Sequence, residues 1–181
     1  NLAGDPGLEG SELGIWALKV SLVSLLATAL FQVIIVVISG SVALLADTIH
    51  NFADAGTAIP LWIAFALNRR QAPKGYTYRW GKAEDLAGVL VVLVIAVSAG
   101  VVFYETAQKF IHPEPLQHLG WVAFAALIGF LGNELAALVR IRTGRRIGSA
   151  ALVADGLHAR IDGLTSLAVL VGAIGVWLGF P

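Results

Sequence analysis

The sequence predicts an all-α membrane protein, a bundle of five transmembrane helices with the character of an inverted repeat. Three observations predict it. First, 57% of the 181 residues are hydrophobic and 13% are charged, with a mean hydropathy of +0.81, whereas a soluble domain carries about 25% charged residues. Second, the apolar residues gather in five long segments. Third, a polar motif in the second segment recurs in the fifth. We therefore expect the lipid bilayer to be the solvent of this chain.

The composition excludes several kinds of site. The sequence contains no cysteine, so disulfides and thiolate ligands are excluded and any transition-metal site must use nitrogen and oxygen atoms. The formal net charge is zero, whereas nucleic-acid binding calls for a basic excess. The first dozen residues are acidic and rich in glycine, unlike the basic start of a signal peptide. We therefore expect no nucleic-acid partner and no cleaved leader.

The elements follow from the apolar segments. Residues 1–14 are polar, contain Gly and Pro, and are expected to be a lead-in to one transmembrane domain over residues 15–181. Each apolar segment is long enough to cross a bilayer as a helix. Pro60 predicts a kink in the second one. The expected spans are residues 16–38, 42–67, 86–107, 119–139 and 149–178.

The basic residues predict the orientation. The connection between the second and third spans holds five Lys or Arg, and that between the fourth and fifth, residues 140–146, holds four Arg. The other two connections hold only Lys109. Because basic loops stay in the cytoplasm, we expect a multi-pass protein of the cell (inner) membrane with a cytoplasmic N-terminus.

A duplicated motif carries the chemistry. Residues 40–57 read GSVALLADTIHNFADAGT and residues 148–165 read GSAALVADGLHARIDGLT, and nine positions are identical at an offset of 108. The shared pattern is D-x-x-H-x-x-x-D, whose polar residues fall on one face of a helix. The candidate metal ligands are His50, Asp54, His158 and Asp162, and Asp47 and Asp155 repeat one turn earlier.

The two copies lie on spans that cross the membrane in opposite directions. A motif duplicated on antiparallel helices is typical of an inverted-topology repeat. Asp54 and Asp162 each lie about 12–13 residues, roughly 18–20 Å, into their spans, so both copies reach the middle of a hydrocarbon core about 30 Å thick. Such a repeat calls for a sixth helix, which this sequence does not supply. We therefore expect the chain to be part of a longer transporter.

Metal binding and a purely structural polar network are the two interpretations of the motif. Each ionisable side chain near the bilayer centre costs ~2.5–3.5 kcal/mol, so four without a use would cost on the order of 10 kcal/mol, which favours metal binding. Two imidazoles and two carboxylates form a tetrahedral set that suits Zn²⁺, and Co²⁺, Cd²⁺, Fe²⁺ and Mn²⁺ stay open. Metal binding would release protons, near neutral pH for an ordinary imidazole, as an antiporter requires.

Other polar residues lie near the motif, and those with two open interpretations are Asp47, Asp155 and Arg160. Asp47 and Asp155 either orient the ligands or line the entry path, or make polar contacts at helix ends. Arg160 either pairs with Glu134 or extends to the membrane surface. Asn133 is expected to contact a neighbouring helix rather than a metal. His112 and His118 lie in the connection before the fourth span and are expected to be solvated.

Three segments resemble a known family: GSVALLADTIHNFAD, YTYRWGKAED and RRIGSAALVADGLHARID are similar to sequences of the cation diffusion facilitator family of divalent-metal/proton antiporters. The resemblance implies one tetrahedral transport site made by His50, Asp54, His158 and Asp162. It also implies a homodimer, not an enzyme, that exports Zn²⁺ from the cytoplasm by alternating access in exchange for protons. Family members with His in the second-helix pair tend to prefer zinc. The family's sixth helix and cytoplasmic C-terminal domain are absent from this sequence.

Three other functions compete with transport. A membrane haem protein could use His50 and His158 as axial ligands, and a Soret band would identify it. A metalloenzyme subunit would need an open ligand position and a general base, and the H-E-x-x-H motif is missing. A non-transporting assembly subunit would tolerate the loss of both Asp54 and Asp162.

Overall fold

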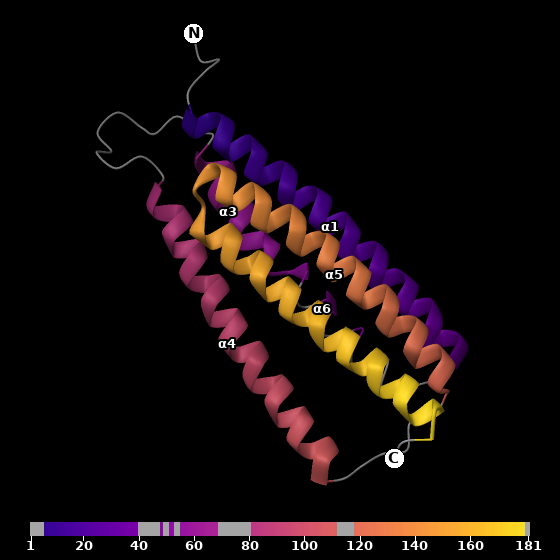
Figure 1. The fold of residues 1–181 in the computed structure, drawn as a ribbon. Helices are drawn as coiled ribbons and strands as arrows, with labels where there is room; N and C mark the ends of the chain where they lie inside the picture. The colour runs from indigo at the N-terminus through magenta and orange to yellow at the C-terminus, as the bar shows by residue number, and fades with distance from the viewer. Residues whose placement is uncertain are drawn as a thin grey trace.

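The computed structural model describes residues 6–39, 48, 51–52, 55–68, 81–111 and 118–179, in which five helices and no strand are found. The helices are α1 (Pro6–Ser39), α3 (Ala58–Asn68), α4 (Gly81–Ile111), α5 (Leu119–Ile147) and α6 (Ala150–Trp177) (Figure 1). Successive helices run in alternating directions, so that α5 is antiparallel to α1 and α6 (Figure 1). The fifth expected span is therefore antiparallel to the second, as the duplicated motif predicts.

Three of the described helices are long and apolar enough to cross a membrane: Glu9–Ser39 of α1, Leu119–Ile147 and Ala150–Trp177. The apolar parts of α3 and α4 are shorter, Ala58–Leu67 and Asp85–Val101. A helix of 28 residues is about 42 Å long, which exceeds the roughly 30 Å of a bilayer core. The predicted class, an all-α membrane protein, is confirmed.

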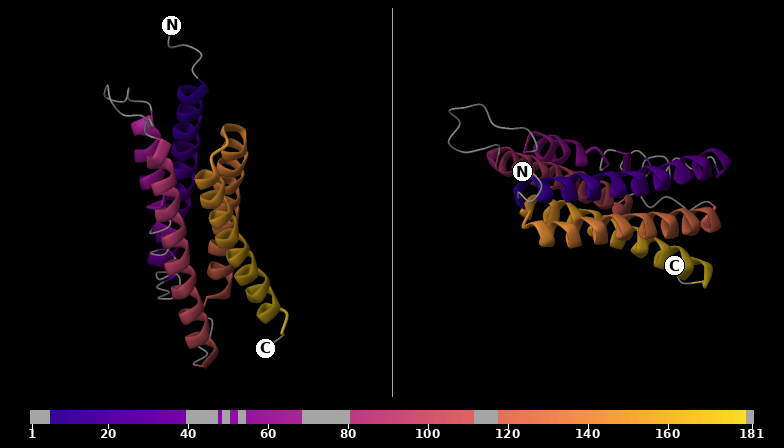
Figure 2. Two further views of the ribbon diagram at one scale, coloured as in Figure 1. Left: turned by 90° about the vertical axis from the view of Figure 1, so that its left-hand side faces the viewer. Right: turned by 90° about the horizontal axis from the view of Figure 1, so that it is seen from above.

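Helix α1 packs against α5 on one side and against α3 on the other, and α4 completes the bundle by packing against α3 and α6 (Figure 2). The largest apolar cluster joins α1 to α3 and to the beginnings of α4 and α6, and includes Leu18, Leu61, Phe65, Val91 and Leu152. This cluster packs the helices together at the end of the bundle where a turn joins α5 to α6. We call this end the α5–α6 turn end.

The seam between α1 and α5 relates the two halves of the chain. The Ser24 hydroxyl donates a hydrogen bond to the Gly132 carbonyl, 3.2 Å away, and a Cβ at position 132 would overlap the Thr28 side chain. Ser24 and Gly132 are 108 residues apart, which is the offset of the duplicated motif. Equivalent positions of two repeats meet where a pseudo-two-fold axis passes between them, so this contact fits an inverted repeat.

Several helices extend beyond the expected spans. Residues 6–14, expected to be a lead-in, form the first turns of α1, where Ser11 is buried and Gly14 lies so close to the Phe65 ring that a Cβ would meet it at 2.9 Å. Residues 140–146, expected to be a polar connection, belong to α5. Arginine favours helices, and α5 ends only where Gly148 adopts φ 72°, the left-handed conformation typical of a helix C-terminus.

The second expected span is interrupted before Pro60. A turn at Gly56 and Thr57 precedes α3, and the Ile59 amide donates to the Gly56 carbonyl at 3.1 Å. Pro60 then lies in the first turn of α3, where a missing N–H leaves no helical hydrogen bond unmade. Instead of the kink expected at Pro60, the structure has a turn about one helical turn earlier along the chain.

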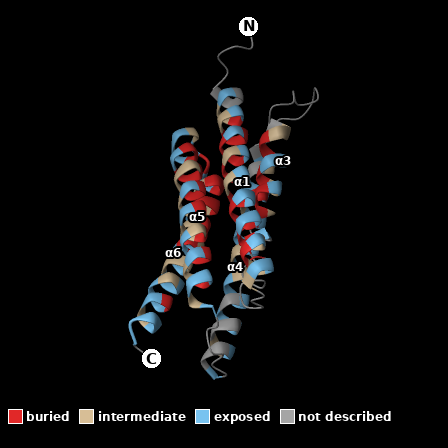
Figure 3. Cartoon of the chain, turned by 90° about the vertical axis from the view of Figure 1, so that its right-hand side faces the viewer, coloured by how far each residue is buried: buried red, intermediate tan, exposed pale blue. Residues whose placement is uncertain are grey.

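Burial is uneven along the bundle (Figure 3). Buried residues line the facing sides of α1, α3 and α5, whereas the second half of α6 and most of α4 are exposed (Figure 3). Val97, Phe103, Leu164, Val171 and Trp177 are all exposed on these two helices. A surface this apolar is unusual for a soluble monomer and is suited to lipid.

Candidate metal site

Helix α6 places His158 and Asp162 one turn apart on its buried side. The helix begins with Ser149, whose hydroxyl accepts a hydrogen bond from the Leu152 amide and so caps the N-terminus. His158 Nε2 lies 3.5 Å from Asp162 Oδ2, and only 8% and 15% of the two side chains are exposed. The two facing atoms are themselves buried. Two metal-binding atoms therefore point to the same place inside the bundle.

The separation of these atoms suits a shared metal ligand set. Two ligands at about 2.0–2.1 Å from a tetrahedral Zn²⁺ lie ~3.3 Å apart. At the same distances an octahedral ion would hold neighbouring ligands ~3.0 Å apart. The observed 3.5 Å between His158 Nε2 and Asp162 Oδ2 is closer to the tetrahedral value. The pair could bind one ion with little rearrangement of either side chain.

Two glycines hold this part of α6 close to α5. A Cβ at Gly156 would meet Arg140 Cβ at 2.9 Å and the Ile141 amide nitrogen at 3.0 Å. A Cβ at Gly163 would meet Asn133 Cβ at 3.2 Å. These glycines are two turns apart and flank the His158–Asp162 pair, so close backbone packing fixes the pair on both sides. Close approach of this kind is what small residues provide between membrane helices.

Asp155 lies in a buried polar network. Its Oδ2 atom forms an ion pair with Arg140 Nη1 at 2.7 Å, and its Oδ1 atom accepts a hydrogen bond from the Thr57 hydroxyl at 2.9 Å. Arg140 Nε donates to the Ser21 hydroxyl at 2.8 Å. The sequence allows Asp155 either to orient the ligands or line the entry path, or to make polar contacts at a helix end. Its described contacts are of the second kind, near the beginning of α6. Its carboxylate faces Arg140 and Thr57.

Arg160 and Glu134 pair with each other. Arg160 Nη2 and Nε donate to the two carboxylate oxygens of Glu134 at 2.7 and 3.2 Å. Both side chains are about one-third exposed. The structure therefore shows the pairing of Arg160 with Glu134. The ion pair is bidentate, which is the strong geometry for an arginine–carboxylate contact.

Other polar side chains are buried close by. Asn133 Nδ2 donates to the Gly129 carbonyl within α5, at 3.1 Å, while its Cβ faces Gly163 of α6. Asn51 Nδ2 donates to Gln32 Oε1 at 2.6 Å, and this contact joins the second expected span to α1. His118 is exposed at the beginning of α5, as expected for a solvated residue.

Part of the expected site lies outside the described residues. His50, Asp54 and Asp47 fall there, as does His112. Within the described part of the chain, no group of three or more metal-binding side chains comes together. The described portion of the candidate site is the pair His158 and Asp162.

The sequence interpretation missed Arg140 as a partner of the motif, because it counted this residue among the basic residues of a connection. Thr57 carried a usable signal, since it is one of the nine identical positions of the duplicated motif, with Thr165 as its counterpart. Ser21 and Gln32 carried none, since single polar residues in an apolar segment are common at helix contacts.

Comparison with known proteins agrees with a membrane protein of the transport class. Residues 18–181 match the model of the cation efflux transmembrane domain. A probable cation efflux system protein of Mycobacterium tuberculosis is 62% identical over 177 residues, which are 98% of this chain and 53% of that protein. The cation-efflux pump FieF of Yersinia enterocolitica is 28% identical over 91% of this chain and 57% of its own. The manganese efflux system protein MneP of Bacillus subtilis is 24% identical over 89% of this chain and 55% of its own.

The chain spans about half the length of these curated relatives. The family match covers almost all of the chain, including every described helix in whole or in large part. On this ground, and with a helical membrane bundle that carries the duplicated motif, the chain belongs to the cation efflux family, the cation diffusion facilitators.

Proposed function

We propose that this chain carries the transport site of an exporter that moves a divalent metal ion, Zn²⁺ in the first place, out of the cytoplasm in exchange for protons by alternating access. His50 and Asp54 of the second span and His158 and Asp162 of α6 are its ligands. The observation that carries the proposal is the buried His158–Asp162 pair, whose sequence pattern recurs at residues 50–54.

Contacts of described neighbours support a site shared between the two copies. Asn51 is hydrogen-bonded to Gln32 of α1, and Ala55 packs in one cluster with Leu25 and Ala136. Thr57 then binds Asp155 of the second copy. The stretch that contains His50 and Asp54 is thus flanked by residues that contact α1, α5 and α6.

The donor set makes zinc the first candidate. Two imidazoles and two carboxylates are a usual tetrahedral set for Zn²⁺, and the 3.5 Å between His158 Nε2 and Asp162 Oδ2 is compatible with a tetrahedral ion. Mn²⁺ is the second candidate, because one relative is named a manganese efflux protein. Fe²⁺, Co²⁺ and Cd²⁺ are the other candidates, and metal uptake into membrane vesicles ranks all five ions.

Proton exchange, orientation and assembly complete the proposal. Metal binding requires neutral imidazole and ionised carboxylate, so an empty site takes up protons that an incoming ion displaces. By the positive-inside rule, the arginines of the α5–α6 turn end support a cytoplasmic position for that end and for the N-terminus, in an inner membrane. The homodimer is carried over from the resemblance to the family.

Metal uptake into inverted membrane vesicles tests the proposal. With an imposed pH gradient, we expect uptake of Zn²⁺ that depends on the gradient, and that exceeds uptake of Mn²⁺, Fe²⁺, Co²⁺ and Cd²⁺. His158→Ala and Asp162→Ala should each abolish the uptake, and so should His50→Ala and Asp54→Ala.

His118→Ala is the matched control, because it removes an exposed imidazole at the beginning of α5. It should leave uptake unchanged. Equal uptake by His158→Ala and His118→Ala would reject the site, and uptake that ignores the pH gradient would reject the proton exchange.

A further inference from the structure

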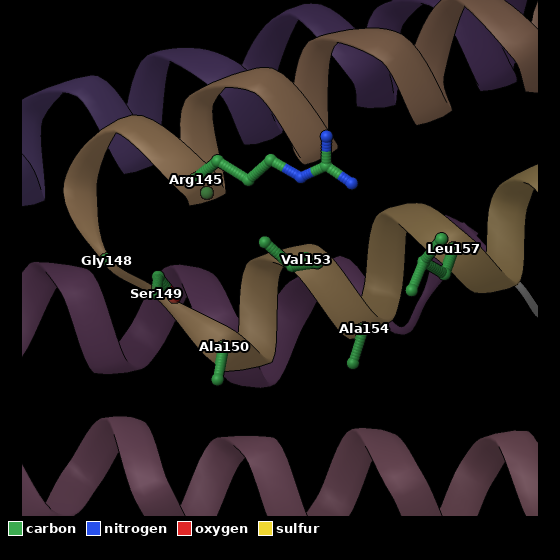
Figure 4. Close-up of a pocket in the computed structure, with 8 residues that line it drawn as sticks. Arg145, Gly148, Ser149, Ala150, Val153, Ala154 and Leu157 are labelled. Carbon is green, nitrogen blue, oxygen red and sulfur yellow. The ribbon is translucent and has the colours of Figure 1, made fainter.

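A groove of about 400 Å³ lies between the last turn of α5 and the first two turns of α6. Its walls include Gly144, Gly148, Ser149, Val153 and Leu157, and they are almost entirely apolar. The polar residues in the lining are Ser149, which caps α6, and Arg145. Figure 4 shows the Arg145 side chain extended along the α5 wall of the groove, opposite Val153 and Leu157 of α6.

Three arginines lie at or beside the groove, and the carboxylates of Glu9 and Glu12 lie at the same end of the bundle on α1, where Gly10 faces Ile147. Arg142, Arg145 and Arg146 are exposed, and none of them forms an ion pair or hydrogen bond with another described residue. The N-terminus of α6 adds a partial positive charge, with its Leu152 amide already capped by the Ser149 hydroxyl. The groove therefore combines an open apolar wall with one guanidinium, which extends from the last turn of α5 past Val153 (Figure 4).

We propose that this groove binds an anionic phospholipid of the leaflet at the α5–α6 turn end. The phosphate lies against the Arg145 guanidinium, and an acyl chain follows the apolar wall of Val153, Ala154 and Leu157. A guanidinium binds phosphate oxygens through paired N–H donors. Basic pockets between membrane helices on the cytoplasmic side bind anionic headgroups in this manner.

The apolar wall favours a lipid over a soluble phosphate. A free phosphate would contact only Arg145 and would leave the apolar wall of the groove without an occupant. A phospholipid satisfies both parts, and the membrane location of the chain supplies it at high local concentration. The inference is independent of the proposed metal site, since none of the groove residues is a candidate ligand.

Retention of lipid by the purified protein tests the proposal. The full chain is reconstituted in vesicles of equal phosphatidylglycerol and phosphatidylcholine, extracted in mild detergent, and its bound lipid is counted by native mass spectrometry. We expect phosphatidylglycerol to be retained in preference to phosphatidylcholine. Arg145→Gln should lower that preference about fivefold, as the loss of one basic residue near an anionic headgroup predicts.

Two further variants separate charge from shape. Arg146→Gln removes the same charge from the neighbouring exposed residue, which does not line the groove, and should keep most of the preference. Ala154→Trp fills the groove and should lower retention with all arginines present. Soluble glycerol phosphate should not displace the lipid.

Three results would overturn the inference: equal retention of the two lipids, equal effects of Arg145→Gln and Arg146→Gln, or displacement by glycerol phosphate. Zn²⁺ binding is measured on the same preparations. Its loss in all of them would count against the proposed metal site and leave the lipid result standing.

Discussion

Arg140 and Asp155 form an ion pair inside the bundle, with Nη1 2.7 Å from Oδ2 and with 2% and 0% of their side chains exposed. The pair also binds Ser21 of α1 and Thr57 in the turn before α3. Asp155 precedes His158 by three residues, on the same side of α6. The ion pair therefore fixes the helix that carries the candidate ligands against three other parts of the chain.

Replacing one member of this pair should be strongly destabilising. In Asp155→Asn the Arg140 guanidinium keeps its charge but loses its buried counter-charge. Removing one partner of a buried ion pair costs about 3–5 kcal/mol. We expect a clear fall in the free energy of unfolding of the protein in detergent micelles, measured by denaturant titration with tryptophan fluorescence.

The control for this variant is Glu9→Gln, the same acid-to-amide change at an exposed position in the first turn of α1. It should change stability by less than about 0.5 kcal/mol. A double variant, Arg140→Met with Asp155→Leu, should recover most of the loss, because apolar replacement of a whole buried pair is often neutral. An Asp155→Asn protein as stable as Glu9→Gln would contradict the prediction.

The α5–α6 seam gives a second prediction. Gly156→Ala should be destabilising and should weaken metal binding, because the new Cβ would lie 2.9 Å from Arg140 Cβ and 3.0 Å from the Ile141 backbone nitrogen. Backbone atoms cannot move aside as a flexible side chain can, so α6 must shift away from α5. Thermal unfolding and Zn²⁺ titration by calorimetry measure the two effects.

Gly172→Ala is the matched change on the same helix, since nothing lies within 4 Å of a Cβ there. It should be neutral or stabilising by about 0.5–1 kcal/mol, because alanine is the better helix former. If Gly156→Ala and Gly172→Ala behave alike, the close packing of α6 on α5 does not contribute to stability.

The helices and the motif could be predicted from the sequence, whereas the contacts between helices could not. Apolar segments of about 20 residues and a repeated D-x-x-H-x-x-x-D pattern are local signals. The burial of Arg140 has no local signal in the sequence, because arginine is mostly exposed in proteins. Here Asp155 balances its charge and Ser21 accepts a hydrogen bond from it, and these two residues come from two other helices.

The Arg160–Glu134 pair could be predicted only in part from the sequence. The sequence left pairing and extension to the surface equally open, because both residues lie well inside apolar segments. The structure places them within 2.7 Å, since α5 and α6 are antiparallel neighbours joined by a short turn. Likewise, Gly156 and Gly163 have visible helical spacing, but only the position of α5 shows which side of α6 they pack.

Metal binding should stabilise the fold and release protons. A ligand that binds only the folded state, at a free concentration 100 times its Kd, adds about 2.7 kcal/mol to stability, so Zn²⁺ should raise the unfolding temperature and a chelator should reverse the rise. His158→Ala should lose the effect and His118→Ala should keep it.

Because the ligands must release protons before they coordinate, the affinity for Zn²⁺ should fall as the pH is lowered from about 7.5 to 5.5. Calorimetry in buffers of different ionisation enthalpy should also detect proton release on binding. An affinity that does not change with pH would mean that Zn²⁺ binds without displacing protons, and the exchange of metal for protons would then have no physical basis at this site.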